Sequence, residues 1–148
     1  MAQIWAKTAA EFFGVAKVNS YSGGTESTEF NVNAVKAVIS AGFDVKREES
    51  ISNPKYLVSY ADDKDPIVCF SKVYNDEFNP QSNFAAIMTC SDADENCPVI
   101  HGANERFSIN YYDPKEFDNT DICEDKYLER FYQIGTEMLY AFSKVRWH

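Results

Sequence analysis

The segment 83–98, NFAAIMTCSDADENCP, constrains the fold more than any other part of this chain. Residues 84–88 form a short apolar run that predicts a buried parallel β-strand. The run leads to Cys90, continues through an acidic turn and reaches a second cysteine, Cys97. Because open α/β sheets place their chemistry at the carboxyl ends of their strands, Cys90 is a candidate functional residue.

Helical and strand-like segments alternate along the rest of the chain. Apolar residues at helical spacing predict helices, and short apolar or alternating runs predict strands. The expected helices are 2–13, 34–41 (with Asn33 as its N-cap) and 125–145, and the expected strands are 16–22, 55–60, 67–73, 83–89 and 107–111. This alternation predicts a single α/β domain over residues 1–148, built as a three-layer, doubly wound and mostly parallel sheet.

Composition and charge argue against several classes of partner. The formal net charge is -9, which disfavours nucleic acid or an anionic membrane surface as the main partner. An aromatic content of 15% indicates that a genuine core can form. No apolar run has the length of a membrane span, and the first residues lack the features of a signal peptide, so a cytoplasmic location is expected.

The cysteines are too few for a disulfide scaffold, and a reducing cytosol predicts that they are free, catalytic or metal-bound. Cys69 lies inside the apolar run PIVCF, which predicts a small buried hydrophobic residue. Cys123 precedes Glu124 and Asp125, whose carboxylates would raise its pKa. Cys123 is therefore a weak candidate for reactivity.

Spacing alone favours two ordinary surface cysteines at Cys90 and Cys97, because C-x6-C is not a redox signature by itself. A zinc site that adds His101 lacks a fourth ligand and the usual C-x2-C spacing. A calcium site on the acidic turn fails too, since its sixth position is Cys97 instead of Gly and its twelfth is Ala103 instead of Glu. Neither a metal nor another cofactor is expected.

The full string TCSDADENCP changes this balance, because it resembles the redox-cysteine loop of the thioredoxin-coupled arsenate reductases, relatives of the low-molecular-weight tyrosine phosphatases. The resemblance covers most of the chain, through MAQIWAK, YSGGT, NVNAVKAV, TCSDADENCP and YYDP. In that family a strand and a C-x5-R phosphate-binding loop precede the helix that MAQIWAK matches. The resemblance therefore implies a chain truncated before that helix, lacking the first central strand and the loop, and inactive by itself.

The resemblance also implies roles for individual residues. The family's nucleophilic cysteine attacks arsenate, a second cysteine releases arsenite, and a third resolves the disulfide for a thioredoxin-like reductant. Cys90 corresponds to the second cysteine and Cys97 to the third. Asp113 of YYDP corresponds to the general acid, although Asp-Pro is by itself a common turn or helix-start signal. Ser22 corresponds to a serine that supports the phosphate loop, and Gln3 stands where some reductases have a potassium-binding glutamate.

Three functions stay open at this point. The first is an arsenate reductase acting on arsenate with a thioredoxin-like protein, and the second is a tyrosine phosphatase acting on a phosphate ester. The third is a noncatalytic relative, a scaffold or thiol switch that keeps only Cys90 and Cys97. A missing central strand would leave unpaired backbone groups, so dimerisation through the exposed sheet edge is also expected.

Overall fold

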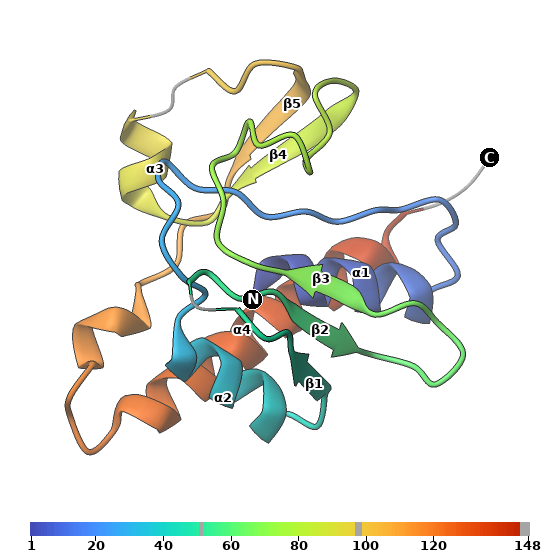
Figure 1. Cartoon of the computed structure of the whole chain (residues 1–148). Helices are drawn as coiled ribbons and strands as arrows, with labels where there is room; N and C mark the ends of the chain where they lie inside the picture. The colour runs from blue at the N-terminus through green and yellow to red at the C-terminus, as the bar shows by residue number, and fades with distance from the viewer. Residues whose placement is uncertain (51, 97–98, 146–148) are drawn as a thin grey trace.

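Two separate sheets, rather than one, organise the strands of this protein (Figure 1). The computed structural model of the chain describes residues 1–50, 52–96 and 99–145. Its antiparallel sheet has the order β1-β2-β3, and its parallel sheet pairs β4 with β5. The strands are β1 Asp44–Arg47, β2 Tyr56–Ser59, β3 Ile67–Cys69, β4 Phe84–Met88 and β5 Ala103–Ser108. The helices are α1 Ala2–Phe12, α2 Val32–Ser40, α3 Ser91–Asn96 and α4 Cys123–Ser143, with a 3-10 helix, η1, at Pro114–Phe117.

The fold is α+β, so the predicted doubly wound, mostly parallel sheet is wrong. β1, β2 and β3 follow one another through the short connections 48–55 and 60–66. Parallel neighbours need a crossover of about a dozen or more residues, and these connections therefore permit only antiparallel pairing. The expected strand pair 55–60 and 67–73 is confirmed, in shorter form, as β2 and β3.

Segment 16–22, expected to be a strand, is not a strand but lies along α1. Side chains of α1 bind its carbonyl groups: Gln3 Nε2 donates to Ser20 O at 3.1 Å, and Lys7 Nζ donates to Val18 O at 2.8 Å. The Ser20 hydroxyl donates in return to the Gln3 carbonyl at 2.7 Å. Because α1 satisfies these backbone groups, the segment has no need of a neighbouring strand.

The main core lies between the antiparallel sheet and helices α1, α2 and α4 (Figure 1). Its largest fully buried side chains are Ile4, Val38, Val58 and Phe131. The ring of Trp5 packs against Phe131 with a centroid distance of 5.1 Å. Burial of such large side chains contributes roughly 1.5–3 kcal/mol each, which makes this cluster the main source of stability.

The expected helices all form, with small shifts of their ends. α2 begins two residues earlier than the predicted Asn33 N-cap requires, because the Asn31 side chain accepts the Asn33 amide at 2.8 Å and caps the helix instead. α4 buries Phe131, Ile134 and Met138 on one face, whereas Val145, beyond its end, is exposed. None of the helices in the described ranges is both long and apolar enough to cross a membrane.

β4 confirms the expected strand 83–89 in shorter form, but its parallel partner β5 begins four residues before the expected strand 107–111 and ends at Ser108, and the pair is not fully buried. Ile87 and Phe107 lie opposite each other in the register and are 41% and 51% exposed. The other face of the pair carries α3, which packs against β4 (Figure 1). The pair is therefore covered on one face only. Dimerisation through a sheet edge exposed by a missing strand stays a prediction.

Candidate functional site

Cys90 lies just beyond the carboxyl end of β4, as the sequence predicts. The ladder continues past the strand ends, since the Tyr111 amide donates to the Thr89 carbonyl at 3.1 Å. The Cys90 carbonyl accepts the Asp94 amide at 3.0 Å and so forms the first turn of α3. Its side chain is half-buried and carries a free thiol. Cys90 therefore stands, partly exposed, at a strand-to-helix junction.

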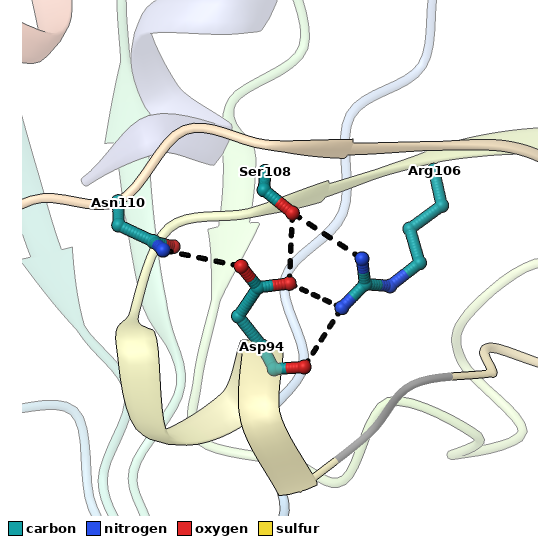
Figure 2. A network of polar contacts seen from close by, with 4 residues as sticks. All are labelled: Asp94, Arg106, Ser108 and Asn110. Atoms are coloured by element: carbon teal, nitrogen blue, oxygen red, sulfur yellow. Dashed lines mark hydrogen bonds and ion pairs between the residues drawn. The ribbon is translucent and has the colours of Figure 1, made fainter.

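Four side chains hold α3 against β5 (Figure 2). Asp94 forms an ion pair with Arg106, whose guanidinium also donates to the Asp94 carbonyl at 2.9 Å. The Ser108 hydroxyl donates to one Asp94 carboxylate oxygen at 2.8 Å, and the Asn110 amide donates to the other at 3.1 Å. These contacts fix a short helix that could not be stable through its own hydrogen bonds.

The hydrogen bonds of this network lower the pKa of the Asp94 carboxyl. The Ser108 hydroxyl has the largest effect, followed by the Asn110 amide, and Arg106 acts in the same direction. A carboxylate that accepts several hydrogen bonds is stabilised in its charged form. The guanidinium of Arg106 is thus held by the carboxylate and the carbonyl of Asp94.

Cys97, the second cysteine of the expected pair, lies outside the described residues. The last described residue before it is Asn96, the final residue of α3. The pairing of Cys90 with Cys97 therefore stays a prediction.

Asp113 stands at the start of η1, where its carboxylate accepts the Lys115 amide at 2.9 Å. This is the common helix-start role of an Asp-Pro sequence, and it does not exclude a second role. Asp113 also lines a hollow of about 340 Å³ together with Met1, Asn31 and Tyr127. The described residues that line this hollow do not include Cys90, so the structure does not bring Asp113 and Cys90 together in one cavity.

A second hollow, of about 260 Å³, lies at the start of α1. Among its lining residues are Met1, Ser22, Cys69 and Lys72. Cys69 is buried, which confirms the prediction of a small buried residue, and burial raises the pKa of its thiol to about 11. Burial lowers the pKa of the Met1 amino group.

Lys72 is the residue that sequence reasoning missed. Its side chain is only 2% exposed, and its ammonium donates to the Ser22 hydroxyl at 3.3 Å. Lysine is rarely buried, and the sequence around it, CFSKVYN, contains no signal that it would be. The Gln3 side chain, at the position of the family's potassium-binding glutamate, donates its Nε2 to the carbonyl groups of Ser20 and Val68.

The described residues contain no group of three or more His, Cys, Asp or Glu side chains arranged to hold a metal ion. The candidate site is therefore the free thiol of Cys90 with the anchored helix α3, and the two hollows lie apart from it. Comparison of the sequence with protein-family models and with curated proteins finds no match.

Proposed function

We propose that this chain carries the disulfide-relay part of a thioredoxin-coupled arsenate reductase, with Cys90 and Cys97 as the relay pair. Two observations support the proposal. The string TCSDADENCP resembles the redox loop of that family, and Cys90 is a half-buried free thiol at the carboxyl end of β4. A cytoplasmic location is part of the proposal, because a reducing compartment returns the pair to its dithiol form.

The overall reaction balances with two thiols. Arsenate accepts two electrons and becomes arsenite, one oxygen leaves as water, and two thiols become one disulfide. A thioredoxin-like dithiol then attacks this disulfide, is itself oxidised and restores both thiols. The resemblance gives Asp113 the proton transfer to the departing hydroxyl of arsenate, a step that accompanies the attack on arsenate and not the disulfide step.

None of the cysteines in the sequence begins a C-x5-R segment. The proposal therefore assigns the disulfide step, and not the attack on arsenate, to this chain. The same observation favours a second candidate function, a noncatalytic thiol switch that uses the same pair. A tyrosine phosphatase would need the same loop and gives Cys97 no role.

The geometry of α3 sets what formation of the relay disulfide would require. A helix of six residues advances by about 9 Å at roughly 1.5 Å per residue. A disulfide needs its two Cα atoms within about 4.4–6.8 Å. Since α3 fills the whole segment between the two cysteines, we expect disulfide formation to unwind α3 and to break the contacts of Asp94. Oxidation of the two cysteines would thus change the conformation of α3.

Oxidation and peptide mapping test the proposal. The reduced protein is treated with oxidised glutathione, digested and analysed by mass spectrometry. We expect a Cys90–Cys97 disulfide, its loss in Cys90→Ser and Cys97→Ser, and its retention in Cys123→Ala, a matched change at a buried cysteine. Absence of this disulfide in the folded protein would overturn the relay and the switch together.

Reduction by a thioredoxin-like protein separates the two candidates. A relay disulfide should be reduced rapidly by such a protein, with stoichiometric oxidation of its dithiol. A disulfide that forms but resists the thioredoxin-like protein would favour the noncatalytic switch. Arsenate turnover by this chain alone, abolished by Cys90→Ser, would show that it also performs the attack on arsenate.

A further inference from the structure

Three polar side chains of β5 and its extension lie on the same face, towards α3, and all three bind Asp94 (Figure 2). They are Arg106, Ser108 and Asn110, which alternate along the chain, and alternate residues of a strand share a face. The opposite face carries Phe107, which is 51% exposed. The covered face of a strand is usually its apolar face. In β5 the polar face is the covered one, which indicates that these side chains serve the contact with α3.

The ion pair between Asp94 and Arg106 is better shielded from water than the other ion pairs among the described residues. Its two side chains are 17% and 27% exposed, whereas those of the other pairs are 35–72% exposed. Water and salt screen a partly buried pair less than an exposed one. Arg106 also donates to the Ser108 hydroxyl at 3.2 Å, and this hydroxyl donates to Asp94. We therefore expect the network to stabilise α3 to a measurable extent.

Only the dithiol form of the proposed relay can keep these contacts. Cys90 directly precedes α3 and Cys97 directly follows it in the sequence. An intact helix of this length holds its ends about 9 Å apart, whereas a disulfide needs its Cα atoms within about 4.4–6.8 Å. The disulfide and an intact α3 therefore exclude each other. An interaction that exists in one of two states shifts the equilibrium towards that state.

We propose that the β5 side chains that bind Asp94, and Arg106 above all, bias the relay couple towards its dithiol form. Arg106 is then a positioning residue, which acts on the cysteines through α3. Stabilisation of the reduced form raises the reduction potential of a dithiol–disulfide couple, so the disulfide is the stronger oxidant. A thioredoxin-like dithiol reduces such a disulfide more readily, and the contacts on β5 help to return the relay to its reactive form. This inference rests on the relay pair proposed above.

Equilibration of the whole chain with glutathione tests this inference. Two glutathione thiols give two electrons and two protons to the protein disulfide and become oxidised glutathione. Over a series of glutathione ratios, iodoacetamide traps the free thiols and mass spectrometry measures the fraction of the Cys90–Cys97 disulfide. In Arg106→Gln the equilibrium constant for reduction should fall roughly fivefold to tenfold, which corresponds to a potential lower by about 20–30 mV.

Arg47→Gln is the matched control, because Arg47 is an exposed strand arginine of the antiparallel sheet. Its equilibrium constant should equal that of the wild type. Arg106→Lys keeps the charge but loses the planar fork of donors, so its equilibrium constant should lie between those of the wild type and Arg106→Gln. Combining Asp94→Asn with Arg106→Gln should add little to either single change, because the two side chains share one interaction.

A merely structural role of Arg106 would leave the equilibrium constant unchanged, since a contact kept in both redox forms stabilises both equally. An unchanged constant in folded Arg106→Gln, or equal changes in Arg106→Gln and Arg47→Gln, would overturn this inference and leave the relay intact. Absence of the disulfide from the wild-type protein would overturn both. Ser108→Ala removes one hydroxyl of the network and protects the test against misfolding of Arg106→Gln. It should lower the constant about threefold, and no change would again overturn the inference.

Discussion

Asp94 of α3 and Arg106 of β5 form an ion pair that fastens the helix following Cys90 to the parallel strand pair. The contact is strengthened from the backbone, because Arg106 also donates to the Asp94 carbonyl at 2.9 Å. A short helix would otherwise fray in water. The order of α3 therefore depends on a tertiary contact. Changes in that contact should alter the rate at which Cys90 forms the proposed disulfide.

Asp94→Asn should loosen α3 and speed the formation of the proposed disulfide. The substitution removes the ion pair and weakens the contacts with Ser108 and Asn110. We expect roughly fivefold faster opening of α3. Hydrogen exchange of the α3 amides and the rate of oxidation by glutathione measure the effect. Glu95→Gln, an exposed change in the same helix, is the control, and equal exchange in both variants would refute the prediction.

The stabilisation that Asp94 provides should disappear in acid. Hydrogen bonds hold its folded pKa below the value in the unfolded chain, which is about 3.9. The stabilisation is therefore complete above the unfolded pKa and is lost as the pH falls through the folded pKa. Urea unfolding of the wild type and Asp94→Asn should differ at neutral pH and converge as the pH falls well below about 4. A difference that persists in strong acid would contradict this assignment.

The thiols should react in an order that follows their burial. Cys90 is half-buried, whereas Cys69 is 4% and Cys123 8% exposed. Burial raises the pKa of Cys69 to about 11, and burial together with Asp118 raises that of Cys123, so both are poor in thiolate. Brief treatment with iodoacetamide near neutral pH, followed by mass spectrometry, should modify Cys90 before either of them. Earlier modification of Cys69 would show that the hollow beside it opens readily.

Tyr127→Phe should destabilise the protein by about 1–3 kcal/mol, because it breaks two hydrogen bonds in a buried place. The Tyr127 hydroxyl donates to Asp118 Oδ1 at 2.9 Å and accepts from the Asn31 amide at 3.0 Å. Urea unfolding measures the change. Tyr132→Phe, at a side chain that is 48% exposed, should alter the free energy of unfolding by less than about 0.5 kcal/mol. Equal effects of the two changes would argue against the network.

Gly135→Ala should also destabilise the fold, by about 1–3 kcal/mol, although alanine is the better helix former. A Cβ atom at Gly135 would lie 2.5 Å from Cε2 of the Trp5 ring, so α1 and α4 would have to move apart. Thermal unfolding measures the loss. Adding Trp5→Phe to Gly135→Ala should recover part of the stability, because the smaller ring leaves space. A more stable Gly135→Ala single variant would show that the two helices adjust freely.

Local features of the sequence predicted the helices and most of the strands. α1 and α4 follow from apolar residues at helical spacing, and β4 follows from an apolar run bounded by polar residues. The place of Cys90 beyond a strand end could also be predicted, because the strand and the acidic turn adjoin each other in the sequence. Such features depend on neighbours along the chain, which a single sequence displays directly.

Pairings between distant residues could not be predicted in this way. Segment 16–22 has the composition of a strand, yet Gln3 and Lys7 bind its carbonyl groups and remove the need for a strand partner. The contact of Asp94 with Arg106 likewise joins a helix to a strand that follows it. Hydrogen-bonding capacity can be satisfied by several partners, and spacing does not say which of them is chosen.

The sequence by itself determined the helical periodicity, the apolar core residues and the two cysteines that frame the acidic turn. Only the tertiary structure decided that the strands divide into two sheets, that α3 is anchored through Asp94, and that Lys72 is buried beside a hollow. The physical reason is the range of the interactions. Periodicity and capping act within a few turns of chain, whereas sheet pairing and the burial of a charge depend on which distant segments fill the space around them.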